Sequence, residues 1–190
     1  MAFIDTPDDP EFFDRNRAAA GHVPNFVRTF AARPAVYEAW KQLNGAIKES
    51  MDLRRYELAT LAAATALKSS YCSLAHGQIL ADKFFSADEV TALADAAPTD
   101  PVDQAVMSFA RKVALGADAV TQTDIDELKA LGLSDGDVLD IALTAAARAF
   151  FSKTLDATGT QPDSVFSGLP ENLRTALTVG RPISSVASGT

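Results

Sequence analysis

The fold of this chain is decided by residues 53–76, which read LRRYELATLAAATALKSSYCSLAH. The first part, Leu53–Leu67, is rich in alanine and leucine and carries few charges. A helix of that composition lies at the centre of a bundle or between subunits. Asp52 is placed to cap this helix, and Ser69 is placed to cap a second helix that runs to about Phe84. The stretch therefore predicts two consecutive helices, one of them buried nearly all round.

Helix start and stop signals continue on both sides of this stretch. Pro10, Pro24 and Pro34 each open a helical run, and the first run is expected to end at Gly21. A second apolar helix is expected around Val138–Phe151. The caps expected further along are Ser86 with Glu89, Asp100, Thr121 or Thr123, and Ser134. No alternating strand pattern of useful length occurs, so the sequence predicts an all-α helical bundle with Leu53–Leu67 and Val138–Phe151 at its centre.

The domain organisation follows from length and composition. The 190 residues are enough for one domain with a sizeable core, and no linker separates two cores. We therefore expect residues 1–190 to form a single domain. Residues 161–190 are rich in Ser, Gly and Pro. They are expected to form a partly irregular C-terminal tail, with one helix at Glu171–Thr178 and a frayed end from residue 181.

Charge and cysteine content exclude several classes of function. The net charge of −8 argues against nucleic acid and anionic membranes as partners. A single cysteine cannot form an intrachain disulfide, and a free thiol fits a reducing compartment. No signal-peptide pattern and no apolar run of membrane-spanning length occurs. The expectation is a cytoplasmic protein.

The residues that could carry chemistry lie within the opening stretch. Cys72 and His76 are four apart, so they share one face of a helix. Cys72 is the third residue after Ser69, which puts its sulfur in the first helical turn, where free amides and the helix dipole favour a thiolate. His76 could take the thiol proton or stabilise the thiolate, and Glu57 could orient the imidazole. Nucleophile, base and orienting group together form an activated thiol.

The same residues have an ordinary structural explanation. A lone cysteine in an alanine-rich helix is usually a small buried hydrophobe, and a histidine one turn away is then a coincidence. Glu57 could pair with Arg54, three residues earlier on its own helix. Spacing alone does not separate this explanation from the catalytic one.

The stretch also resembles the signature of the alkylhydroperoxidase D-like / carboxymuconolactone decarboxylase family. In that signature a glutamate precedes a Cys-x-x-Cys-x-x-x-His motif by twelve residues. Glu57 lies twelve residues before Ser69, Cys72 falls at the second cysteine and His76 at the histidine. Weaker similarities occur at residues 21–26, 53–57 and 131–135, so the resemblance covers about residues 20–160. It implies an oligomeric helical bundle, a trimer or a hexamer.

The resemblance implies a peroxidase-related antioxidant enzyme with one departure. Ser69 replaces the first cysteine, so an internal disulfide cannot form. The implied reaction is hydroperoxide reduction by Cys72 with an external thiol. His76 would manage the proton and Glu57 would hold His76, while Tyr71 or a water would protonate the leaving group.

Two alternatives stay open. One is a carboxymuconolactone decarboxylase-like lyase, in which Glu57 and His76 act as acid-base groups on a small carboxylate or lactone. The other is a non-enzymatic oligomeric relative.

Other residues predict little additional chemistry. No cofactor is expected, because the sulfur would carry the electrons. No metal is expected, because two histidines and one cysteine show no ligand spacing with nearby carboxylates. His22 is interpreted as a helix-connector residue. Phe84-Phe85 and Phe150-Phe151 are interpreted as core or subunit contacts, and either pair could wall an apolar pocket.

Overall fold

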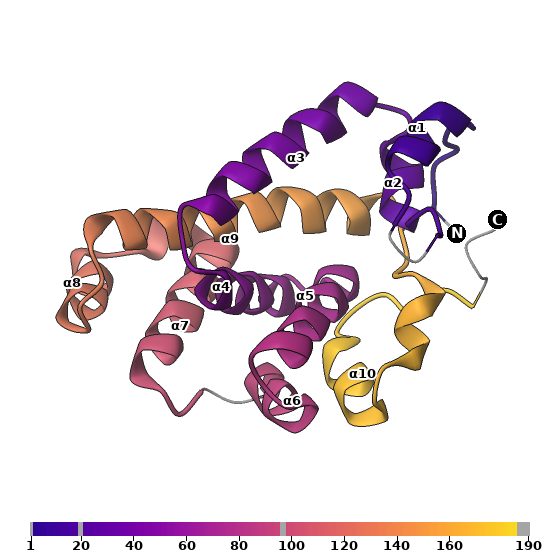
Figure 1. Ribbon diagram of the computed structural model, residues 1–190. Helices are drawn as coiled ribbons and strands as arrows, with labels where there is room; N and C mark the ends of the chain where they lie inside the picture. Colours follow the sequence, from indigo (N-terminus) through magenta and orange to yellow (C-terminus); the bar gives the residue numbers. More distant parts are fainter. Residues whose placement is uncertain (1, 19–20, 96–97, 186–190) are drawn as a thin grey trace.

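A computed structural model describes residues 2–18, 21–95 and 98–185 of the chain. Every regular element within these ranges is helical, as Figure 1 shows, so the predicted all-α class is confirmed. The helices in chain order are α1 (Pro10–Arg15), α2 (Asn25–Phe30), α3 (Pro34–Glu49), α4 (Leu53–Ala66), α5 (Ser70–Lys83), α6 (Ala87–Asp95), α7 (Pro101–Gly116), η1 (Ala117–Ala119), α8 (Gln122–Ala130), α9 (Asp135–Ala157), η2 (Ser164–Gly168) and α10 (Glu171–Leu177).

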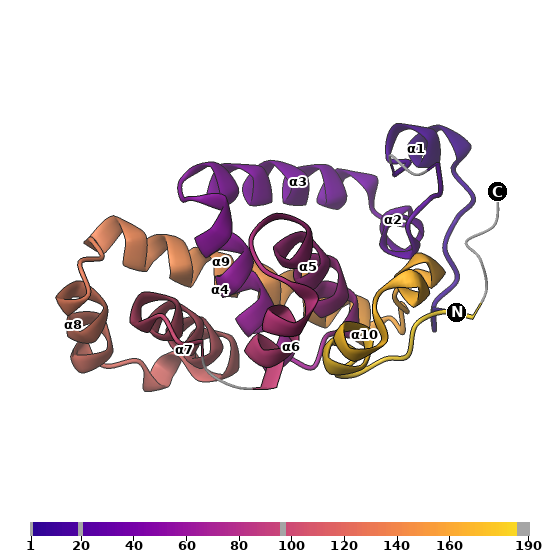
Figure 2. The same cartoon turned by 60° about the horizontal axis from the view of Figure 1, so that its bottom comes forward.

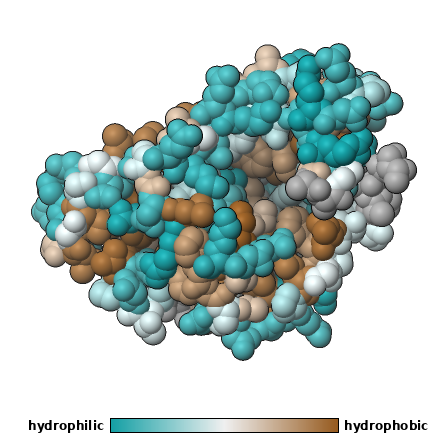
Figure 3. Space-filling model, viewed as in Figure 1, coloured by the Kyte–Doolittle hydropathy of each residue, from teal (hydrophilic) through white to brown (hydrophobic). Residues whose placement is uncertain are grey.

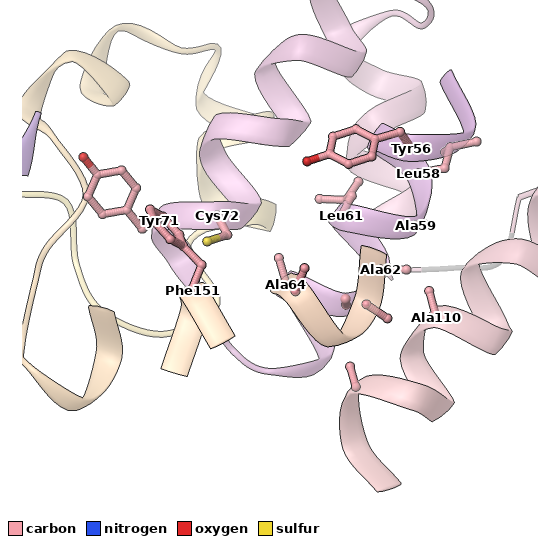
Figure 4. Packing of buried hydrophobic residues seen from close by; sticks show 14 of the residues in the cluster. Tyr56, Leu58, Ala59, Leu61, Ala62, Ala64, Tyr71, Cys72, Ala110 and Phe151 are labelled. Carbon is pink, nitrogen blue, oxygen red and sulfur yellow. The ribbon is translucent and has the colours of Figure 1, made fainter. Parts of the chain in front are cut away.

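Helix α4 is the centre of the bundle. It packs against α5, α7 and α9, and its residues from Tyr56 to Ala64 are all buried. The alanines of α4 let neighbouring helices approach closely, and Figure 4 shows Ala62 of α4 and Ala110 of α7 within the same buried cluster. The central position predicted for Leu53–Leu67 follows from this composition.

The expected caps explain where most helices begin. Asp52 accepts a hydrogen bond from the amide of Arg55 at 2.9 Å, and Asp100 accepts one from the amide of Val102 at 2.9 Å. The hydroxyl of Ser134 accepts from the amide of Asp137 at 3.1 Å. The expectation for the first helix was wrong at its end. Helix α1 stops at Arg15 rather than near Gly21, because the side chain of Asn16 bonds to the carbonyl of Phe12 and closes the last turn.

Two arginines at the start of α4 tie the bundle together. Arg54 forms a two-bond ion pair with Asp103 of α7, with Nη1 and Oδ1 at 2.7 Å. Arg55 forms an ion pair with Asp137 in the first turn of α9. These pairs fix α7 and α9 against the N-terminal end of the central helix.

The C-terminal segment is more ordered than expected. Residues 160, 163 and 184 are buried, and the amide of Ser184 bonds to the carbonyl of Pro162 at 2.9 Å. Arg181 donates to the carbonyl of Asp156 at 2.6 Å. The predicted fraying is therefore wrong for residues 181–184, because these contacts fix the segment to α9. The rest of that predicted tail, residues 186–190, lies outside the described residues.

Helix α9 was expected to be buried all round, but one stripe of it faces outward. Leu139, Leu143 and Phe150 are exposed on α9, while Ile141, Ala145 and Leu155 are buried. Figures 1 and 2 show α3 lying along one side of α9, with α8 at one end of the molecule and α1, α2 and α10 at the other. In Figure 3 hydrophobic residues gather on the visible face toward the α7–α8 end. Within the described ranges, no helix is both long and apolar enough to cross a membrane.

Candidate active site

A cavity of about 290 Å³ opens between α2, α3, α5 and α9. Aromatic rings form most of its wall, and its polar lining includes a thiol, an imidazole and a guanidinium. Its lining residues are Phe26, Tyr37, Trp40, Lys41, Asn44, Gly45, Tyr71, Cys72, Ala75, His76, Arg148 and Phe151. Two of the three candidate catalytic residues, Cys72 and His76, therefore face the same enclosed space.

Glu57 holds the imidazole of His76 from behind the cavity wall. Glu57 Oε2 lies 2.5 Å from His76 Nδ1, which joins α4 to α5. The carboxylate is fully buried, and its other oxygen lies 3.8 Å from Nζ of Lys48. The alternative pairing with Arg54 does not occur, because Arg54 pairs with Asp103. A carboxylate on Nδ1 fixes the orientation of the ring and leaves Nε2 available for chemistry.

Cys72 occupies the position that its distance from Ser69 predicted. Ser69 is the residue before α5, so the sulfur lies in the first turn of that helix. The Cys72 side chain is almost fully buried in the core yet borders the cavity. Figure 4 shows the sulfur in the buried cluster together with Tyr71 and Phe151. The structural and catalytic interpretations of Cys72 thus describe two sides of one residue.

Arg148 of α9 is the cation of the cavity, and the sequence interpretation did not include it. Its Nη1 donates to the sulfur of Cys72 at 3.6 Å, and its Nη2 donates to the hydroxyl of Tyr56 at 3.4 Å. The guanidinium also lies 5.8 Å from the ring centre of Trp40 and 5.7 Å from that of Phe151. Arg148 is only 4 % exposed, so its charge is held inside the molecule.

Burial and charge set the protonation of His76. Burial, followed by the positive charge of Arg148, lowers the pKa of His76, and the hydrogen bond from Glu57 opposes this only in part. A histidine with a lowered pKa is neutral at pH 7. His76 is therefore suited to accept a proton, and it is not the positive charge of the site.

Comparisons with known proteins fit this arrangement. Residues 34–115, from α3 to α7, match the carboxymuconolactone decarboxylase family. A peroxidase-related protein from Ralstonia eutropha JMP134 with an alkylhydroperoxidase AhpD core superposes with a TM-score of 0.77 at 25 % identity, over 87 % of this chain and 94 % of that one. The predicted resemblance is confirmed.

Two further solved structures share the family fold. A peroxidase-related protein from Silicibacter sp. TM1040 has a TM-score of 0.77 at 20 % identity, over 88 % of this chain and 94 % of that one. A variant of the debrominase Bmp8 in complex with 2,3,4-tribromopyrrole has a TM-score of 0.68 at 18 % identity, over 90 % of this chain and 94 % of that one. No curated protein matches this chain in sequence.

Ser69 is the point at which the chain departs from the dithiol pattern of the family. Ser69 stands at the N-cap position of α5, as predicted, but its hydroxyl makes no capping hydrogen bond. The side chain is fully buried. The capping role expected for this hydroxyl was therefore wrong, and the first-turn amides near Cys72 are not occupied by it.

Tyr71 lines the cavity, but its hydroxyl is engaged elsewhere. The hydroxyl donates a short hydrogen bond to Oδ2 of Asp163, in the segment that follows α9. Burial and then the charge of Asp163 raise the pKa of Tyr71 well above its ordinary value. His22, interpreted as a connector residue, lies 4.0 Å from the same carboxylate oxygen. Tyr71 is thus poorly placed to give up a proton in the cavity.

The remaining predictions can be located as well. Phe151 walls the cavity and Phe150 is exposed, so that pair serves both of the roles considered for it. Phe85 lies under the guanidinium of Arg54, 5.0 Å from its ring centre. Among the described residues, no group of three or more His, Cys, Asp or Glu side chains is arranged to hold a metal ion.

Proposed function

We propose that this protein reduces organic hydroperoxides through Cys72 and draws electrons from an external thiol. The observation that carries the proposal is the shared cavity of Cys72 and His76, with His76 fixed by buried Glu57 at 2.5 Å. A thiol, a neutral imidazole and an orienting carboxylate are the parts of an activated cysteine. The peroxidase-related relatives and the family match support the same class of chemistry.

The reaction balances with one cysteine. The thiolate of Cys72 attacks the terminal oxygen of ROOH, the O–O bond breaks, and the leaving alkoxide takes a proton to give ROH. A water held at Nε2 of His76 supplies that proton, since the hydroxyl of Tyr71 donates to Asp163. The sulfenic acid then reacts with an external thiol to give a mixed disulfide and water. A second external thiol releases Cys72 and leaves as the disulfide.

The cavity favours a bulky substrate over hydrogen peroxide. Five aromatic side chains contribute to its wall, and a volume of about 290 Å³ is close to that of a small-molecule site. Flat apolar walls bind rings and alkyl chains by dispersion and by removing apolar surface from water. Cumene hydroperoxide therefore suits the cavity better than a molecule of two oxygens.

The direct test is consumption of a small thiol in the presence of cumene hydroperoxide. We expect turnover with wild-type protein, a sulfenic acid on Cys72 when the thiol is omitted, and no turnover by Cys72→Ser. A brominated pyrrole belongs in the substrate panel, because the debrominase Bmp8 shares this fold. An inert Cys72 with every oxidant would contradict the proposal.

A second candidate is acid-base catalysis of the decarboxylase type. The Glu57–His76 bond favours it, because that pair could move a proton without the sulfur. In this case Cys72→Ser would keep activity on a small lactone or carboxylate, whereas His76→Gln would lose it. If neither class of substrate reacts, the non-enzymatic alternative remains.

A further inference from the structure

The charge of Arg148 has no carboxylate to balance it. Among the described residues, Arg148 forms no ion pair with an aspartate or a glutamate, and its Nε is buried without a hydrogen-bond partner. A buried, uncompensated guanidinium is costly, because the protein interior screens and solvates charge far less than water does. The side chain therefore requires a negative group close by.

Only two ionisable groups bond to the guanidinium, Tyr56 and Cys72. The hydroxyl of Tyr56 donates its proton to Oδ1 of Asn44 at 2.8 Å while it accepts from Arg148. A phenol that donates its proton is neutral, so Tyr56 contributes a lone pair and not a charge. The sulfur of Cys72 is the remaining acceptor, and a thiol ionises more readily than a phenol.

We propose that Cys72 and Arg148 form a thiolate–guanidinium ion pair in the resting protein, which makes Arg148 the positioning residue of the nucleophile. Burial opposes the charge on Arg148, but the neighbouring Cys72 and Tyr56 raise its pKa, so the guanidinium remains charged. The rings of Trp40 and Phe151 lie beside it and keep water from screening the pair.

The other charged groups around the sulfur do not replace Arg148. His76 is one turn further along α5, and burial and Arg148 both lower its pKa, so it is neutral at pH 7. Lys41 of α3 is paired with Glu38 at 2.9 Å, and Lys48 lies 3.8 Å from Glu57. Glu57 itself is bonded to His76. His76 then serves the proton transfer, while Arg148 keeps the sulfur ionised.

The ion pair can be tested without turnover. Alkylation of Cys72 by iodoacetamide, followed over a range of pH, gives a profile whose midpoint reports thiolate formation. We expect Arg148→Met to move that midpoint upward by at least about one pH unit, the effect of a close opposite charge, with an equal number of tenfold losses in rate at a fixed lower pH. Arg148→Lys should fall between, because a lysine keeps the charge but not the planar fork.

Two controls keep the result interpretable. Arg33→Met removes an exposed arginine far from the sulfur, and its profile should match wild type. Thermal unfolding of Arg148→Met shows whether the fold is intact. If the reagent cannot reach Cys72, the thiolate is read from its ultraviolet absorbance, with Cys72→Ser as the baseline.

The inference deepens the proposed function, and the two can fail separately. An unchanged midpoint in folded Arg148→Met overturns the ion pair even if the protein is a peroxidase. A midpoint that moves only in His76→Gln overturns it too, because the imidazole would then be the stabilising group. A shifted midpoint in a protein that reduces no hydroperoxide supports the ion pair and removes the proposed substrate.

Discussion

Ser69 is the residue that decides how the oxidised sulfur is returned to the thiol. It precedes Cys72 by three residues, one helical turn away, so Ser69→Cys would restore the Cys-x-x-Cys spacing. We expect this variant to turn over peroxide faster at low external thiol, because the new cysteine can close a disulfide before the sulfenic acid is over-oxidised. Initial rates at several thiol concentrations measure this. Ser70→Cys, one position off, is the matched control, and an equal gain there would contradict the resolving role.

His76 should also make stability depend on pH. Its pKa is lowered in the folded protein by burial and by Arg148, so the unfolded chain binds a proton more readily. The free energy of unfolding should therefore fall as pH drops below about 6.5, the ordinary histidine value. Urea unfolding between pH 7.5 and pH 5.5 checks this. His76→Gln should flatten the slope, whereas His22→Gln, which removes the other histidine, should keep it.

The residues near the start of α5 were within reach of the sequence, and Arg148 was not. Glu57, Cys72 and His76 are linked by short, fixed spacings on two consecutive helices, and such spacings determine which side chains share a face. Arg148 lies 76 residues beyond Cys72, so its contact depends on how α9 crosses α5. The available signal was a charge inside an apolar helix. That argument drew attention to Glu57 and applies equally to Arg148.

Among the elements, α10 depends on one glycine of α5. A Cβ on Gly77 would lie 2.3 Å from Cδ1 of Leu177, the last residue of α10. Gly77→Ala should therefore lower the free energy of unfolding by about 1–3 kcal/mol, because the core must shift to admit the methyl group. Chemical denaturation measures the loss. Gly136→Ala is the control, since its Cβ would meet only Oγ of Ser134 at 3.5 Å, and an equal loss in both variants would contradict the packing explanation.

Helix limits were predictable where caps are local, and the C-terminal segment was not. Asp52, Asp100 and Ser134 bond to amides two or three residues away, so the sequence contains both partners. The segment after α9 is fixed by contacts across the fold, such as Arg181 on the carbonyl of Asp156. A stretch rich in Ser, Gly and Pro gives no sign of such contacts, which explains why it was predicted to fray.

At the scale of the whole molecule, the exposed stripe of α9 supports the proposed homo-oligomer. Leu139, Leu143 and Phe150 are 59 %, 40 % and 46 % exposed, and apolar side chains in a row on one helix mark a contact surface. We expect light scattering to give a mass of several chains, and Leu143→Asp to reduce it. Glu127→Asp on exposed α8 is the control. A wild-type mass of one chain would contradict the assembly.

Trp40 gives the cavity an optical readout of its own. It is the one tryptophan of the chain, it lines the cavity, and its ring stacks on Phe151 with centroids 4.9 Å apart. The guanidinium that contacts Cys72 also lies against this indole. Intrinsic emission excited at the indole band therefore reports a single place in the protein, with no second tryptophan to subtract. Binding of a ring in the cavity, or loss of charge on the sulfur, should change its intensity, so one fluorescence trace could follow substrate entry and the redox state of Cys72 in real time.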